Sequence, residues 1–198
     1  MHASTLGKAV VVAAMALVGV GCGPSWQVVK QANPNPFVGV KNFSLENVSY
    51  PQGGIQVGDK TEDAWLAEKK PEQVESYKKD KDDTANAIAK KLTENKSGLA
   101  FSQVPPGTPA AGDTFLVKPI ITFLEPGIFT AVFNIATTVR MSAQVLDKSG
   151  TVVDEIAFTA SQPADLYHPA TGPRMVNCGE ELGEQLVKYL QSRTTGAK

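Results

Sequence analysis

Apolar and polar residues alternate most clearly between residues 137 and 158, and this pattern predicts an antiparallel β-hairpin. One face of its first strand carries apolar or small residues: Thr137, Val139, Met141, Ala143 and Val145. The other face carries polar ones: Thr138, Arg140, Ser142 and Gln144. A period of two is typical of a sheet with one buried and one solvated face. A turn at Asp147-Lys148-Ser149-Gly150 leads to the partner strand, which contains Val152, Ile156 and Phe158.

Two stretches repeat their apolar residues at helical spacing instead. The first lies between Glu72 and Glu94, and its stripe consists of Val74, Tyr77, Ala85, Ile88 and Leu92. The second is a seam near the end of the chain, formed by Met175, Cys178, Leu182, Leu186 and Tyr189. We expect two long helices there. The acidic residues Glu180, Glu181 and Glu184 are expected in the first turns of the second helix, where they complement its dipole.

Shorter apolar runs predict further strands at 37–43, 99–104 and 114–124. Pro119 lies within the last of these runs and marks an edge or a bulge, because proline donates no hydrogen bond to a sheet. The predicted fold is therefore of the α+β class. It has a mainly antiparallel sheet of about five strands, with two principal helices packed against it.

Residues 1–21 are typical of a bacterial signal peptide, with a weakly basic start followed by an apolar run over 9–20. This run is too short for a membrane span, which takes ~20 apolar residues. We expect residues 22–36 to form the mature N-terminus and an extended tether, because the prolines in Asn33-Pro34-Asn35-Pro36 disfavour helix. Residues 37–198 are expected to form a single α/β periplasmic domain.

The run Leu17-Val18-Gly19-Val20-Gly21-Cys22 resembles the lipobox of bacterial lipoproteins, which ends in a small residue and the modified cysteine. The resemblance implies that Cys22 receives a thioether-linked diacylglycerol and usually a third, amide-linked chain. Gly23 stands where aspartate signals inner-membrane retention in many enteric bacteria, so the resemblance implies the periplasmic face of the outer membrane. Ordinary cleavage before Cys22, which would give a secreted protein, stays open.

The remaining chain is similar to uncharacterised envelope lipoproteins whose α/β domain resembles that of curli-secretion lipoproteins and of the N-terminal domain of the Tol-system propeller protein. The likeness lies in packing patterns: Phe37-Val38-Gly39-Val40, Ala87-Ile88-Ala89-Lys90-Lys91-Leu92, the hairpin, and Leu182-Gly183-Glu184-Gln185-Leu186. The chain has no clear counterpart of the extra pore-forming segments of curli channels.

The candidate chemistry is sparse. The formal net charge of −1 does not favour a nucleic-acid partner. After removal of the signal, His168 is the one histidine, and Cys178 is the one cysteine other than the anchor. We therefore predict neither a metal site nor a cofactor. A nucleophile pair of Cys178 and His168 is conceivable, but Cys178 lies on the apolar seam, where a thiol does not readily ionise. The acidic run from Asp80 lacks the Gly and Glu positions of a calcium loop.

One segment supports a binding role. Residues 126–134 are unusually apolar, and Phe129 and Phe133 are candidates for a contact with a partner or a bilayer. Burial in the core is the simpler interpretation, because periodicity does not locate so short a run.

These patterns favour a lipid-anchored, non-enzymatic protein that binds or scaffolds an outer-membrane or periplasmic complex. Its expected partners are the membrane, through Cys22, and an envelope protein. Enzymatic activity stays open, since an envelope hydrolase that uses carboxylates needs no visible motif. A carrier or sensor of a small apolar ligand would require an enclosed apolar cavity.

Overall fold

The predicted hairpin lies at the centre of a mixed sheet. The computed structural model describes residues 26–110, 112, 114–130 and 132–196 of the chain. Among these residues the main sheet has eight strands: β1 (Trp26–Lys30), β2 (Asn42–Glu46), β3 (Gln56–Val57), β4 (Lys60–Thr61), β5 (Ala100–Val104), β6 (Phe115–Glu125), β9 (Thr137–Leu146) and β10 (Val152–Gln162). A separate two-stranded hairpin consists of β7 (Ile128–Phe129) and β8 (Asn134–Ile135).

The order of the main strands is β1-β10-β9-β6-β2-β5, with β3 beside β6 and β4 beside β3. Pairing is antiparallel from β1 to β6 and parallel from β6 to β5. The α+β class with two principal helices is confirmed, and the sheet is larger and more mixed than expected. The parallel part follows from the long crossover through α2 that joins β2 to β5, because a tight turn cannot connect parallel strands.

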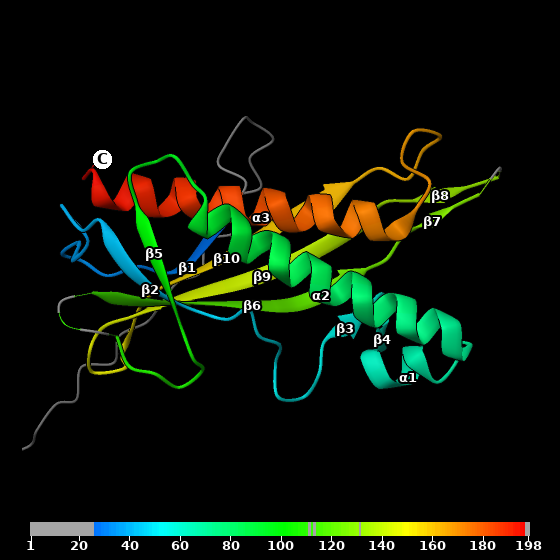
Figure 1. Ribbon diagram of the computed structural model, residues 1–198, viewed down its shortest axis with the longest axis horizontal. Coiled ribbons are helices and arrows are strands. Elements are labelled where there is room, and N and C mark those ends of the chain that lie inside the picture. Colours follow the sequence, from blue (N-terminus) through cyan, green and yellow to red (C-terminus); the bar gives the residue numbers. More distant parts are fainter. Residues whose placement is uncertain (1–25, 111, 113, 131, 197–198) are drawn as a thin grey trace, which may run out of the picture.

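Both long helices lie on the same face of the sheet (Figure 1). The helices are α1 (Glu62–Leu66), α2 (Pro71–Thr93) and α3 (Thr171–Thr194). Pro71 occupies the first turn of α2, where its missing N–H costs nothing. The predicted seam of α3 is buried throughout. Because α3 begins at Thr171, the three glutamates expected in its first turns lie near its middle instead.

Two glycines of α3 allow it to approach α2 closely. A Cβ atom added at Gly179 would lie 2.6 Å from the carbonyl oxygen of Thr84, and one at Gly183 would lie 2.7 Å from the Cβ of Lys91. Both contacts are shorter than real side chains allow. The two helices run in the same direction, because successive contacts advance along both of them.

The apolar face of the hairpin meets these helices. The residues Thr137, Val139, Met141, Ala143 and Val145 are all buried, as predicted. The opposite face of β9 is partly solvated, and Arg140 stacks there over the ring of Phe123 at 4.4 Å. The core is therefore one layer thick between the sheet and the two helices.

Two expectations about the chain before residue 46 were wrong. The strand expected at 37–43 begins only at Asn42, although Phe37 is fully buried. Trp26–Lys30, expected within the tether, forms the edge strand β1 against β10. The irregularity expected at Pro119 lies farther along β6: Pro119 pairs in register with Ala143, and the register with β9 shifts between Ile121 and Phe123.

None of the helices formed by the described residues is both long enough and apolar enough to cross a membrane.

We expect Gly179→Ala to destabilise the domain by about 1–3 kcal/mol, because the new methyl group must push apart two packed helices. In a solvent-exposed part of a helix the same change would stabilise the protein by about 1 kcal/mol. The sign of the change in unfolding free energy therefore shows whether the helices are closely packed at Gly179. Gly53→Ala is the control, since nothing lies within 4 Å of its added Cβ, and it should change stability by less than about 0.5 kcal/mol. Urea unfolding measures both values, and a neutral Gly179→Ala would contradict the close approach.

Candidate contact surface

The β7–β8 hairpin projects beyond the helices at one end of the sheet (Figure 1). Its exposed apolar side chains include Ile128, Val132, Phe133 and Ile135, and Val132 is 91% exposed. Phe133 is 56% exposed, whereas Phe129 is half-buried. Burial of this stretch in the core, the simpler of the two interpretations, is therefore wrong for its large apolar side chains other than that of Phe129. The hairpin extends past the start of α3 (Figure 1), so most of its apolar side chains stay exposed.

The tip of the hairpin is held by its own polar side chains. The hydroxyl of Thr130 donates to the carbonyl of Phe133 at 2.6 Å and accepts from the backbone N–H of the same residue at 2.9 Å. The backbone N–H of Thr130 donates to the side-chain oxygen of Asn134 at 3.2 Å. Side chains thus form hydrogen bonds with backbone groups that would otherwise bond to water.

The base of the hairpin requires a glycine. Gly127 has a φ of +73°, and an added Cβ would lie 2.6 Å from the carbonyl oxygen of Ile135. The backbone N–H of Gly127 donates to Glu125 at 3.0 Å. The chain can therefore turn sharply out of β6 and return directly into β9.

A second exposed apolar segment lies in the loop 163–170. Leu166 and Tyr167 are 82% and 89% exposed. Asp165 faces its own loop: its carboxylate accepts from the backbone N–H groups of Tyr167 and His168 at 2.9 and 2.8 Å. The loop thus bonds its carboxylate internally and presents its apolar side chains outward.

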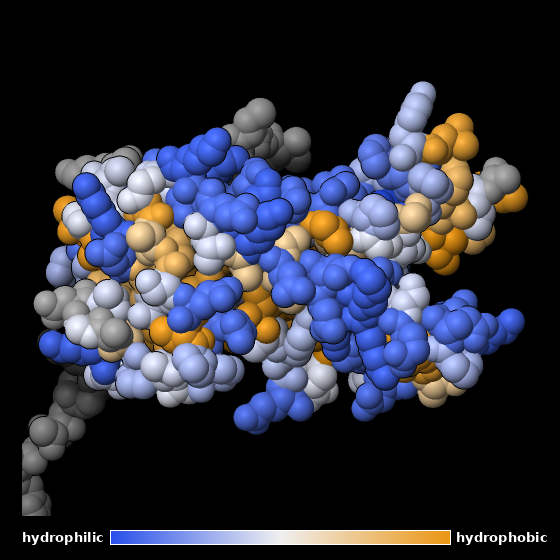
Figure 2. Space-filling model, in the orientation of Figure 1, coloured by the Kyte–Doolittle hydropathy of each residue, from blue (hydrophilic) through white to orange (hydrophobic). Residues whose placement is uncertain are grey.

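Together these segments form what we call the apolar end surface. It consists of Ile128, Phe129, Val132, Phe133, Ile135, Leu166 and Tyr167. Figure 2 shows apolar residues gathered at the upper right of the molecule, above the hydrophilic side chains of α2. A cluster of this kind on a surface is characteristic of a site of contact with a protein or a membrane.

Arg174 joins the two segments from below. This arginine is 1% exposed, and its guanidinium donates to the carbonyls of His168 and Pro169 at 2.7 and 2.8 Å and to that of Pro126 at 3.3 Å. Its Nε donates to the hydroxyl of Thr137 at 2.8 Å. One side chain thus connects the base of the hairpin, the loop 163–170 and the start of β9.

The predicted anchor, Cys22, lies outside the described residues, but from Trp26 onward the chain is firmly docked. The ring of Trp26 meets that of Tyr189 edge-on, with centroids 6.0 Å apart. The buried carboxylate of Asp154 accepts from the Tyr189 hydroxyl at 2.5 Å, from Arg193 at 3.0 Å and from the backbone N–H of Ala32 at 2.8 Å. The N-terminal segment is therefore part of the domain from Trp26 onward.

Cys178 and His168 do not form a nucleophile pair. Cys178 is completely buried, and its thiol donates to the carbonyl of Thr137. Burial, reinforced by the negative charge of Glu181, raises the pKa of the Cys178 thiol to about 12. His168 is exposed, and its Nδ1 lies 3.0 Å from Asp165. Cys178 and His168 thus have different partners, one in the core and one in an exposed loop.

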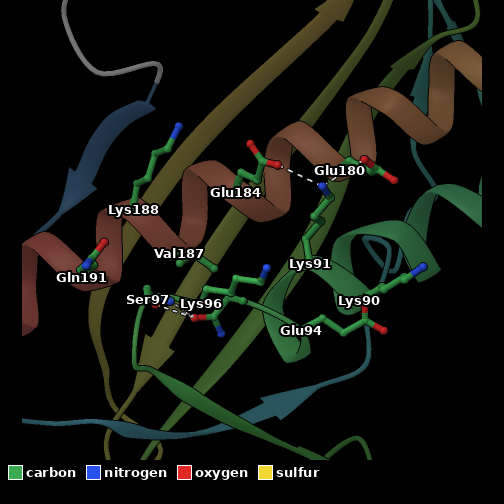
Figure 3. A pocket seen from close by; sticks show the side chains of 11 residues that line it. Lys90, Lys91, Glu94, Lys96, Ser97, Glu180, Glu184, Val187, Lys188 and Gln191 are labelled. Carbon is green, nitrogen blue, oxygen red and sulfur yellow. Dashed lines mark hydrogen bonds and ion pairs between the residues drawn. The ribbon is translucent and has the colours of Figure 1, made fainter.

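A cavity of about 670 Å³ lies between the C-terminal half of α3 and the end of α2 (Figure 3). Lys91 reaches across it to Glu180 and Glu184 at 3.1 and 3.0 Å. These ion pairs connect the two helices. Apart from Val187, the lining is polar or charged, which differs from the apolar cavity that a carrier of an apolar ligand needs.

Within the described part of the chain, no three His, Cys, Asp or Glu side chains gather closely enough to hold a metal ion. The two buried carboxylates are engaged elsewhere: Asp154 as above, and Glu46 with Lys118 at 3.1 Å and the backbone N–H of Gly107 at 2.6 Å.

Known structures resemble this domain at low sequence identity. PelC from Paraburkholderia phytofirmans, crystallised as a dodecamer, is 12% identical with a TM-score of 0.42, over 81% of this chain and 96% of its own. A minor lipoprotein from Acinetobacter baumannii is 11% identical with a TM-score of 0.43, over 77% and 93% of the two chains. The hypothetical protein CT253 from Chlamydia trachomatis is 13% identical with a TM-score of 0.43, over 77% and 96%.

No protein family and no curated protein matches the sequence. A lipoprotein is among these similar structures. At these scores they transfer no activity or partner to this chain. The finer likeness to curli-secretion and Tol proteins stays a prediction.

Sequence reasoning found Phe129 and Phe133 but missed Leu166, Tyr167 and Arg174. Leu166 and Tyr167 carry a usable signal, because two neighbouring large apolar residues inside a loop rich in proline have no periodic partner to bury them. Arg174 has a weaker signal. It directly precedes the seam residue Met175, so it lies close to the buried face of α3.

We predict that Arg174→Met destabilises the domain by about 2–4 kcal/mol, because it leaves the carbonyls of His168 and Pro169 without their side-chain donor and removes one of the two donors to the carbonyl of Pro126. Hydrogen exchange should accelerate first at residues 126–137 and 163–170, while α2 and α3 stay protected. Arg174→Lys is the matched control: it retains the charge but not the forked geometry, so its effect should be intermediate. Uniform acceleration across the whole domain would contradict a local anchoring role.

We also predict that the Cys178 thiol does not react with iodoacetamide at pH 8 in the folded protein, because the raised pKa leaves almost no thiolate. Mass spectrometry before and after denaturation in urea measures this directly. Modification should appear only after unfolding. Rapid modification of the native protein would show that the thiol is accessible and ionised.

Proposed function

We propose that this chain is a lipid-anchored, non-enzymatic protein of the bacterial envelope that acts as a binding or scaffolding component of a complex at the periplasmic face of the outer membrane. Cys22 is the proposed anchor, and the α+β domain supplies the contact surfaces. The proposal goes beyond the low structural likenesses and depends on this chain's own residues.

The observation that carries the proposal is the apolar end surface. Seven apolar side chains from two segments project from the end of a well-packed domain, and a buried arginine fixes the position of both segments. Fully burying one such side chain yields about 1.5–3 kcal/mol, so leaving several in water is costly. A partner surface that covers them accounts for their exposure.

The chemistry of the remaining residues supports binding over catalysis. The thiol of Cys178 is buried and its pKa is raised, and His168 is paired with Asp165 in an exposed loop. The buried carboxylates of Asp154 and Glu46 neutralise arginine and lysine side chains. Each of these groups stabilises the fold where it lies.

The proposal is tested by the accessibility of residue 133 in isolated envelopes. Phe133→Cys should react slowly with a membrane-impermeant maleimide, because the contact covers it. Ser102→Cys is the matched control, since Ser102 is exposed on β5 and the substitution is nearly isosteric. With Cys22→Ser added, both variants should leave the membrane fraction and react equally fast.

Mass spectrometry of the native protein provides the readout for the anchor. A mature chain that begins with an acylated Cys22 is expected. An unmodified Cys22 thiol would overturn the anchor. Equal labelling of Phe133→Cys and Ser102→Cys in the membrane fraction would overturn the contact surface.

A further inference from the structure

We propose that the apolar end surface contacts the lipid bilayer itself, so that the domain is seated on the membrane that holds its anchor. This inference rests on the proposed lipidation of Cys22. It names the occupant of the apolar end surface and fixes the orientation of the domain.

The first reason is the short link between the anchor and the fold. Three residues, 23–25, lie between Cys22 and Trp26, so their Cα atoms are four residue steps apart and at most about 14 Å from each other. Trp26 is already paired with Phe158 in the sheet. The edge of the domain therefore lies within about 14 Å of the lipidated sulfur, which is far closer than a tether ending at residue 36 would allow.

The second reason is the direction of β1. This strand runs antiparallel to β10, with Trp26 opposite Phe158 and Lys30 opposite Glu155. The chain before Trp26 therefore enters from the side on which β10 ends at Gln162. Four residues of β10 cover about 13 Å, which is close to the reach of the link from Cys22.

The end of β10 adjoins the apolar end surface. Gln162 is paired with Thr137, the first residue of β9, and the loop 163–170 follows directly. The opposite edge strand, β5, lies five strand spacings from β1, or about 24 Å, which exceeds the reach of the link. The anchor can thus reach the end of the sheet that bears the apolar end surface but not the β5 edge.

The third reason is the charge pattern of the hairpin. No charged residue occurs between Glu125 and Arg140, so the whole projection can leave water without removing an ion from its hydration shell. In the neighbouring loop, Asp165 is bonded within the loop, and Leu166 and Tyr167 are the outermost apolar residues. Tyrosine is also a residue favoured at the boundary between lipid and water.

The fourth reason is the hydrogen bonding at the tip. Lipid offers no partner to backbone N–H and C=O groups, so a turn that enters it has to satisfy them internally. The hydroxyl of Thr130 bonds both backbone groups of Phe133, and Asn134 accepts from the backbone of Thr130. This pattern suits an apolar environment better than a turn whose backbone bonds to water.

Contact at this end leaves the rest of the domain facing the periplasm. β5 and the C-terminal end of α3, which Figure 1 shows at the end of the molecule opposite to the hairpin, then lie away from the membrane. These surfaces stay accessible to the other components of the proposed complex.

The inference is tested with the full lipidated chain, purified in detergent and reconstituted into vesicles of phosphatidylethanolamine and phosphatidylglycerol. A single environment-sensitive NBD fluorophore is attached to Phe133→Cys or, in separate preparations, to Leu166→Cys or Ser102→Cys. The buried Cys178 does not compete for the label. We expect a several-fold rise in emission at positions 133 and 166, quenching of both by doxyl-labelled lipids, and no change at position 102.

The outcomes separate this inference from the proposed function. Unchanged emission at position 133, in vesicles that retain the acylated chain, would overturn the bilayer contact. If residue 133 is nevertheless protected in envelopes, a protein covers the surface, and the proposed function stands without this inference. A chain with an unmodified Cys22 that does not sediment with vesicles would overturn the proposed anchor. Circular dichroism confirms that each labelled variant is folded.

Discussion

A guanidinium buried beneath the end of the sheet is the interaction on which the contact surface depends. An isolated two-stranded hairpin is marginally stable in water, and β7 and β8 are only two residues long each. Arg174 offsets this weakness by bonding the carbonyl of Pro126 below the hairpin and those of His168 and Pro169 in the adjoining loop. The apolar side chains are therefore held outward instead of collapsing onto the core.

A second buried polar cluster connects the N-terminal segment to the fold. Asp154 is fully buried and bonds Tyr189, Arg193 and the backbone of Ala32, while Arg193 also donates to the carbonyl of Ala32 at 3.0 Å. A buried carboxylate is tolerated only when such partners surround it. The cluster fixes β1 beside β10, and it thereby shortens the link between Cys22 and the rigid domain.

The sequence allowed those elements to be predicted that bury one face with a regular period. The hairpin of β9 and β10 and the seam of α3 are of this kind, because each apolar residue of the pattern meets the same core. The parallel pairing of β2 with β5 could not be predicted, since it joins residues far apart in the chain. β1 could not be predicted because it is short. Only two of its five residues, Trp26 and Val28, are apolar and share the face of the sheet that carries Phe158 and Ile156.

The candidate site was only half visible for a related reason. A run such as Ile128-Phe129 has the same composition whether it is buried or exposed, so its location depends on where the helices stop. The role of Arg174 could not be predicted because it depends on backbone carbonyls. Every residue has a carbonyl, so the sequence does not show which of them meet the arginine. Local patterns thus identify what a segment prefers, whereas the site arises from what lies beside it.

In the proposed arrangement the anchor and the apolar end surface have different tasks. Two or three acyl chains hold a protein far more firmly than one, so the hairpin is not needed for affinity. Once Cys22 is held at the membrane, contact by the hairpin becomes an intramolecular event, and even weak side-chain insertion is then effective. A single flexible anchor leaves a domain free to rotate, whereas a second contact some distance from the first defines which face points away. An envelope scaffold needs that definition, because its partners can bind only the surfaces that the membrane leaves free.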